Sequence, residues 1–161
     1  MRDAEVIEPD NTQMESRLDL LSPNLANELS RVNEQKLRKV AYSVCDFALR
    51  HVSINNPLVN QSFEAFKGSA SIDILSLRRN LSGLIEQLDE IQWDIQEQVD
   101  LGLDTRENYV KAFRNARAIN ALFYAFDPNP YIAAAESIYE AYAATYDFKS
   151  LEEAINEILI E

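Results

Sequence analysis

Apolar residues recur along most of the chain at spacings of three and four positions, the repeat of a helix with one buried face. The most regular run follows Ser71 and steps by three and four in turn, as in the seam of a helical bundle. It comprises Ile74, Leu77, Leu81, Leu84, Leu88, Ile91 and Ile95. We expect one helix from residue 71 to about residues 100–102, with this seam packed against the rest of the protein.

Helix-start signals divide the rest of the chain into further helices. Three are a cap residue followed by proline, and three resemble a capping box. They are Ser22-Pro23, Asn56-Pro57 and Asn129-Pro130, and Thr12 with Glu15, Asp104 with Glu107, and Ser150 with Glu153. The pattern predicts helices over 12–21, 23–53 with a joint near Asn33, 57–68, 71–101, 104–126, 129–146 and 150–160.

These elements predict an all-α fold, a single-domain helical bundle of about six or seven helices with short loops over residues 12–161. Residues 1–11 are polar and acidic, and we expect a flexible acidic arm there. Three glycines and five prolines among 161 residues leave too few turn residues for a β-rich fold. A chain of this length can bury one core by itself.

The formal net charge is −12, which bears on the class of partner. A nucleic-acid binder needs a basic surface to displace counterions from phosphates, and anionic lipids repel an acidic protein. No apolar run approaches the roughly 20 residues that span a bilayer, and the first residues lack the apolar core of a signal peptide. We therefore expect a cytoplasmic protein with a basic protein partner, and neither nucleic acid nor membrane.

The helix expected after residue 71 carries an acidic ridge opposite its seam. Between positions 86 and 104 there are seven acids and no base. Like charges at i,i+4 cost a helix a few tenths of a kcal/mol per pair, so helix stability does not explain the ridge. We predict a partner-binding surface with an aromatic anchor and steering charges. It comprises Glu86, Glu90, Trp93, Asp94 and Glu97. The alternative is a solvated face with Trp93 covered by a neighbouring helix or by the arm.

Candidates for catalysis or metal binding are few. Cys45 and His51 lie six residues apart on one expected helix, on different faces, and cannot hydrogen-bond along it. We expect Cys45 to be a small core residue and His51 to cap a helix end. A carboxylate-bridged di-iron site needs inward-facing acids and two Glu-x-x-His pairs, whereas this chain has one histidine. We expect no catalytic residues, no metal, no cofactor and no enzymatic activity.

Two stretches, 31–50 and 105–126, are rich in Lys and Arg. The simplest interpretation is pairing with acidic helices of the same bundle or across a homodimer; phosphate binding would be a third use, although no glycine-rich loop is present. Tyr139, Tyr142 and Tyr146 share one helical face, which is typical of a core rim and alternatively of a pocket or interface.

Two further stretches resemble a small helical immunity-protein family of bacterial polymorphic-toxin systems. Its opening is matched by Arg38, Ala41, Cys45, Ala48, His51, Val52, Pro57, Phe63, Ala65, Phe66 and Gly68, and its alanine-rich second half by Ala112, Ala116, Arg117, Ala133, Ala134, Ala135 and Ala141. The resemblance implies a helical protein that binds and neutralises a cognate toxin. The further histidines of that second half are missing here, so no histidine-based site is carried over.

Three functions follow as hypotheses. The first is a non-enzymatic interaction protein of immunity or inhibitor type that binds a basic partner through its acidic face. The second is a structural or assembly homo-oligomer. The third is a small-molecule-binding helical domain, whose pocket would be lined by residues such as Tyr139, His51 or Arg117.

Overall fold

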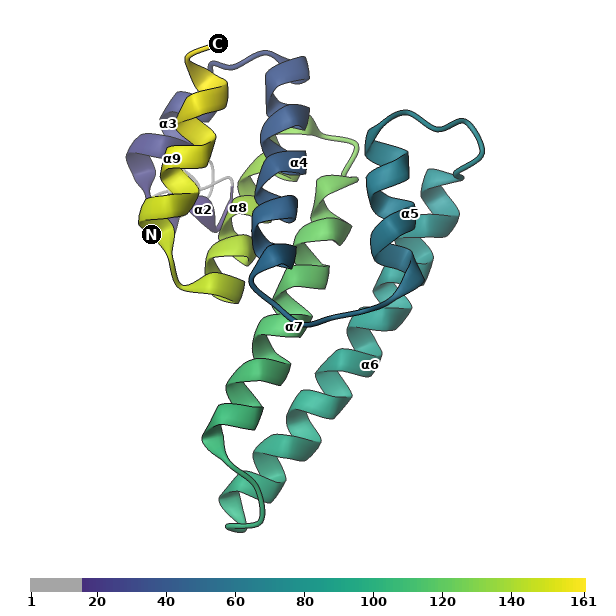
Figure 1. Cartoon of the computed structure of the whole chain (residues 1–161). Helices are drawn as coiled ribbons and strands as arrows, with labels where there is room; N and C mark the ends of the chain where they lie inside the picture. Colours follow the sequence, from purple (N-terminus) through teal and green to yellow (C-terminus); the bar gives the residue numbers. More distant parts are fainter. Residues whose placement is uncertain (1–15) are drawn as a thin grey trace, which may run out of the picture.

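The computed structural model describes residues 16–161 and folds them into eight helices, with no strand in this part of the chain (Figure 1). They are α2 (Leu18–Leu21), α3 (Pro23–Leu29), α4 (Glu34–Arg50), α5 (Pro57–Phe66), α6 (Ile74–Asp100), α7 (Arg106–Ala125), α8 (Pro130–Thr145) and α9 (Phe148–Leu159). The all-α, single-domain bundle predicted from the sequence is confirmed. The expected arm over 1–11 and the capping box of Thr12 and Glu15 lie outside the described residues.

The proline-marked helix starts are where the sequence places them. The side chains of Ser22, Asn56 and Asn129 accept hydrogen bonds from backbone N–H groups in the first turns of α3, α5 and α8. Each satisfies a donor that the helix itself leaves without a partner. The stretch over 23–53 is two helices because Asn33 caps α4, with its Oδ1 2.9 Å from the N of Lys36. This break raises the count above the expected six or seven.

Three predicted starts are wrong by one to three residues, because a neighbouring side chain takes the capping position. Asp73 caps α6 in place of Ser71, and Thr105 caps α7 in place of Asp104. Asp147 caps α9 in place of Ser150, whose backbone N–H donates to Asp147 Oδ1 at 3.1 Å. The helix pattern was therefore a better guide than the exact cap.

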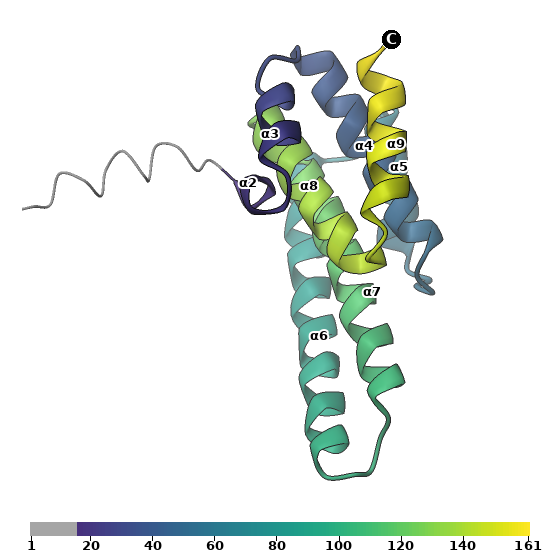
Figure 2. The same cartoon turned by 90° about the vertical axis from the view of Figure 1, so that its left-hand side faces the viewer.

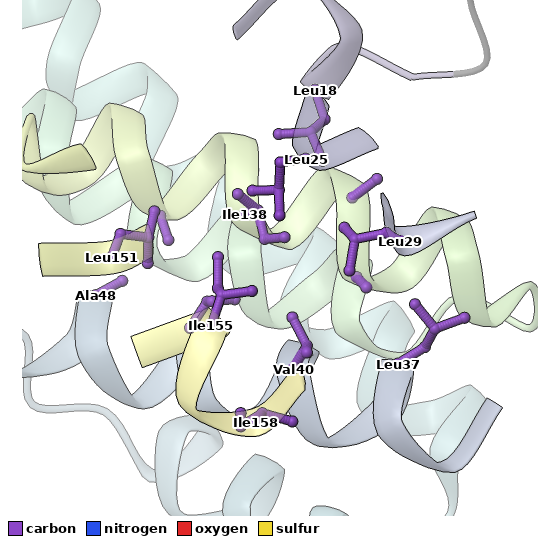
Figure 3. Packing of buried hydrophobic residues seen from close by; sticks show 14 of the residues in the cluster. Leu18, Leu25, Leu29, Leu37, Val40, Ala48, Ile138, Leu151, Ile155 and Ile158 are labelled. Atoms are coloured by element: carbon purple, nitrogen blue, oxygen red, sulfur yellow. The ribbon is translucent and has the colours of Figure 1, made fainter. Parts of the chain in front are cut away.

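Two apolar clusters form the core, and α4 contributes to both. Leu37, Val40 and Val44 face the first cluster, which α2, α3, α8 and α9 complete together with Ala118 of α7 (Figure 3). Ala41 and Cys45 face the second, built with α6 and α7 and covered by α5. Each fully buried Leu or Ile side chain contributes about 1.5–3 kcal/mol through removal of apolar surface from water.

Helix α8 lies at the centre, packed against α4 and α7. Most of its alanines are buried, namely Ala133, Ala134, Ala135, Ala141 and Ala144. A helix buried on most sides needs no single apolar stripe, and small side chains let its neighbours approach closely.

Helices α6 and α7 form an antiparallel hairpin whose far half extends beyond the other helices (Figures 1 and 2). The seam of α6 is buried at Leu77, Leu81 and Leu84, but Ile91 is 49% exposed. The expectation of a seam buried along its whole length is therefore wrong at Ile91 in the far half, and also at Ile74 at the start of the helix, which is 38% exposed. Two helices alone can cover only a narrow strip of each other, and no third described helix reaches this part of the hairpin.

Candidate functional site

The predicted partner-binding residues lie together on the outer face of the projecting half of α6. Glu86, Glu90, Trp93, Asp94 and Glu97 follow each other at helical spacing, and every one of them is exposed. We call this set the acidic face. Trp93 is 63% exposed, so the alternative in which a neighbouring helix covers it does not hold among the described residues.

The carboxylates of the acidic face are free of ion pairs with any residue in 16–161. The other acids of the ridge differ. Asp89 lies 3.8 Å from Arg117 Nη2, Asp100 accepts from Gln96 at 3.0 Å, and Asp104 accepts from Thr105 and Asn108. The hydrogen bond from the Asn108 side chain, with that from the Thr105 N–H, lowers the pKa of Asp104. The unpaired charges are thus concentrated beside the exposed indole.

The opposite side of α6 is held to α7 by a few polar and aromatic contacts. Gln92 Nε2 donates to the hydroxyl of Tyr109 at 3.3 Å, and the rings of Tyr109 and Phe113 stack with centroids 6.3 Å apart. Leu101 and Leu103, in the turn of the hairpin, are 65% and 73% exposed. The projecting half therefore offers apolar surface as well as negative charge.

A second polar constellation lies inside the bundle and was not predicted. Arg17 donates through Nε to Glu136 at 2.7 Å and through Nη2 to Glu140. Arg117 Nη1 lies 3.1 Å from Glu140 Oε1, and the Glu140 side chain is 1% exposed. We call Arg17, Arg117, Glu136 and Glu140 the buried charge cluster.

Electrostatics and aromatic faces hold the cluster together. Burial raises the pKa of the Glu140 carboxyl, and Arg117 and Arg17 reduce this shift without cancelling it. The guanidinium carbon of Arg17 lies 4.5 Å from the ring centroid of Tyr139 and 5.5 Å from that of Tyr124. Because Arg117 also faces Asp89, the cluster links the centre of the bundle to the base of the hairpin. We assign it a structural role, that of fixing the hairpin on the body.

Cys45 and His51 do not form a nucleophilic pair. Cys45 is fully buried, and burial raises the pKa of its thiol, which disfavours the thiolate. His51 is exposed at the end of α4, with Nδ1 2.8 Å from the carbonyl oxygen of Phe47. Within residues 16–161, no group of three or more His, Cys, Asp or Glu side chains is arranged to hold a metal ion.

Tyr139, His51 and Arg117 do not converge on one pocket. Tyr139 and Arg117 belong to the surroundings of Glu140, whereas His51 lies at a cleft beside α7. A separate apolar groove of about 830 Å³ lies between α4, α5, the start of α6 and the end of α7. Its apolar lining includes Tyr42, Phe66, Ile74, Leu75 and Phe126.

The tyrosine stripe on α8 lies at the edge of the core. Tyr139 and Tyr142 are half-buried, and Tyr146 is 67% exposed.

None of the described helices combines the length and the hydropathy that a membrane crossing requires. Comparison with protein-family models, curated proteins and solved structures finds no match to this chain.

Proposed function

We propose that this protein is a non-enzymatic protein-binding domain, and that its acidic face engages a basic partner protein. The observation that carries the proposal is the exposed Trp93 among four exposed and unpaired carboxylates on a projecting hairpin. Covering this indole with a partner would remove a large apolar surface from water and so contribute to binding. Tryptophan is also among the residues most enriched at the energetic centres of interfaces.

The charges beside Trp93 would attract a basic partner before the indole makes contact. Four carboxylates that form no ion pair with any residue of 16–161 create a negative potential that steers a basic surface toward the indole and raises the association rate. Their position on a hairpin that extends beyond the other helices allows a partner to approach without clashing with the rest of the protein (Figure 2). We expect the partner to present Lys and Arg around an apolar pocket.

The resemblance to immunity proteins of polymorphic-toxin systems suggests an inhibitor role for this binding. A basic toxin domain would be covered or blocked by the hairpin, and the inhibitor itself would need no catalytic residue. Such a protein needs no reactive thiol, and burial raises the pKa of the Cys45 thiol.

The test is capture of partners from a lysate of the source organism on the immobilised full chain, with elution by stepped salt. We expect one basic protein that rising salt releases, because the contacts of the acidic face are screened. Its affinity is then measured for Trp93→Ala and for the triple variant Glu90→Lys, Asp94→Lys, Glu97→Lys. Each should weaken binding by at least about tenfold.

A matched control reverses three exposed acids away from the hairpin, at Glu28, Glu153 and Glu157. This variant changes the net charge by the same amount and should retain binding near the wild-type affinity. If the hairpin and control variants bound equally well, the assignment of the acidic face would be wrong.

A homo-oligomer is the second candidate, and the apolar groove between α4, α5 and the start of α6 favours it. Leu75 at this groove is 73% exposed, which is unusual for a leucine next to other apolar side chains. A mass that rises with concentration in light scattering or sedimentation would support self-association. A strict monomer would leave the acidic face as the binding surface.

A further inference from the structure

A cleft of about 490 Å³ lies between the end of α4 and the first half of α7, away from the acidic face. Its volume is in the range of sites for small molecules. His51 and Ser53 contribute from the α4 side, and Arg106, Lys111, Arg114 and Asn115 from α7. We call it the cationic cleft.

The helical repeat of α7 explains why the three cations meet there. At about 100° per residue, Arg106, Lys111 and Arg114 fall within an arc of roughly 140°. The first turn of α7 also lines the cleft, so the positive end of the helix dipole adds to their charge. One acid, Glu107, shares the lining without an ion pair to any of them.

The cations of the cleft are unpaired in a protein of net charge −12. Other basic side chains have partners: Arg117 faces Glu140, Lys39 faces Glu161, and Arg38 donates to carbonyl oxygens at the end of α7. Within 16–161, the Lys and Arg side chains with neither an ion pair nor a hydrogen bond are Arg31, Arg79, Arg106, Lys111, Arg114 and Lys149. Half of this set therefore lines one cleft, and pairing within the described bundle does not account for it.

Two of the lining residues each carry a buried polar atom that lacks a hydrogen-bond partner in the described chain, namely Arg114 Nε and Asn115 Oδ1. Both atoms are shielded from solvent, so they lie behind the wall of the cleft and are not themselves contacts for a ligand. The guanidinium carbon of Arg114 lies 5.9 Å from the ring centroid of Tyr146. Tyr146 itself is the left-handed C-cap of α8, with φ of 56°, and its N–H donates to the Tyr142 carbonyl oxygen.

We propose that the cationic cleft binds a small organic phosphate. Arg and Lys side chains beside a helix start favour a multiply charged oxyanion, and the planar guanidinium matches the oxygens of a phosphate. Because Nδ1 of His51 donates to the Phe47 carbonyl oxygen, Nε2 of the neutral ring is an acceptor, which a hydroxyl on the organic part of the ligand can satisfy at the rim. This site goes beyond the proposed protein-binding function and shares no residue with the acidic face.

The test is a titration of the full chain with glycerol phosphate at fixed pH and ionic strength, followed by proton NMR. His51 is the single histidine of the chain, so its imidazole Cε1–H signal reports on the cleft without ambiguity. We expect this signal to move and saturate with glycerol phosphate, and to stay in place with acetate at the same ionic strength. No movement at about 10 mM phosphate ester, a concentration that would reveal millimolar binding, would overturn the proposal.

Two double variants separate the cleft from general charge effects. Lys111→Gln with Arg114→Gln should weaken binding by at least about tenfold. Arg31→Gln with Lys149→Gln removes the same charge outside the cleft and should leave the dissociation constant unchanged. Equal weakening in both would overturn the proposal in favour of diffuse attraction. Arg114 is half-buried, so its replacement can also disturb the fold. The single variant Lys111→Gln, at an exposed position, is therefore measured as well. It should lose part of the affinity for glycerol phosphate while its far-UV circular dichroism stays unchanged.

Discussion

Single carboxylates at helix starts make this fold sensitive to acid. Asp147 is the N-cap of α9, and its Oδ1 accepts from the Ser150 backbone N–H at 3.1 Å. That hydrogen bond, which only the ionised carboxylate accepts at full strength, lowers the pKa of Asp147. Asp73 does the same for α6, where hydrogen bonds from Ser76 lower its pKa.

The stability that Asp147 contributes should therefore depend on pH in a defined direction. A carboxyl whose pKa is lower in the folded state stabilises the fold above its ordinary pKa of about 3.9, and loses this contribution as pH falls through the folded value. Asp147→Asn keeps a cap without a titrating group, so its urea midpoint should fall less than that of the wild type between pH 5 and pH 2. At pH 5, the urea midpoint of Asp147→Ala should be lower than that of the wild type. Parallel pH profiles for wild type and Asp147→Asn would contradict this account.

Residue-level chemistry was predicted unevenly from the sequence. The burial of Cys45 and the position of His51 at a helix end followed from their helical neighbours. The buried charge cluster did not, because Arg17 reaches Glu136 and Glu140 across more than 100 positions of sequence. One signal was available: the two glutamates lie four residues apart inside the alanine-rich stretch of α8, where unpaired charges would be costly to bury.

At the scale of one element, α6 has one glycine within it and another just after its end, and the two have opposite roles. Gly83 lies within the helix and is exposed, and a Cβ built there meets nothing within 4 Å. Gly102 follows the end of the helix with φ of 76°, which only glycine adopts without strain. The same substitution should thus have opposite effects at the two positions.

We expect Gly83→Ala to stabilise the protein by about 1 kcal/mol, because alanine has the higher helix propensity and no contact opposes it. Gly102→Ala should destabilise it by about 1 kcal/mol, because its left-handed backbone disfavours a side chain. Urea unfolding of both variants followed by circular dichroism measures the free energies of unfolding. A loss of stability in Gly83→Ala would mean that the helix is bent or packed there in a way that its surroundings do not indicate.

Helix positions were predictable because their signals are local, and caps were less so because several candidates lie close together. At the start of α9, both Asp147 and Ser150 are good capping residues, and the sequence alone does not indicate which of them is the N-cap. The cap at Asp147 extends the start of α9 by nearly one turn and brings Phe148 into the helix, where it packs against the first core cluster.

At the scale of the whole molecule, the body and the projecting half of the hairpin are nearly independent. The buried residues of α6 end at Leu84, and those of α7 begin at Ala116. Both core clusters therefore lie within the body, and the hairpin beyond them adds few buried contacts.

Replacing residues 91–111 by a short glycine-containing loop should leave the body folded. Because no residue of either core cluster is removed, we expect the free energy of unfolding to change by no more than about 1 kcal/mol, with a smaller dependence on urea since less surface is exposed on unfolding. Circular dichroism during urea titration measures both quantities. Loss of the cooperative transition would show that the hairpin is part of the folding unit.

The bundle was predictable as a class, and the projection of its hairpin was not. The heptad spacing through Ile95 is the same in the buried and the exposed half, so periodicity assigns a face without stating what covers it. Only the lengths and directions of the other helices determine that α5 and α8 stop short of Ile91. The acidic face is exposed because no other described helix extends along this half of the hairpin.

Trp93 is the single tryptophan of the chain, and its indole is 63% exposed. The intrinsic emission of the native protein should therefore already be close to that of indole in water, and unfolding should shift its wavelength little. Covering the acidic face would instead move the indole into an apolar environment and shift the emission to shorter wavelength. The emission wavelength of Trp93 should therefore change little when the core unfolds and should shift when a partner binds the hairpin.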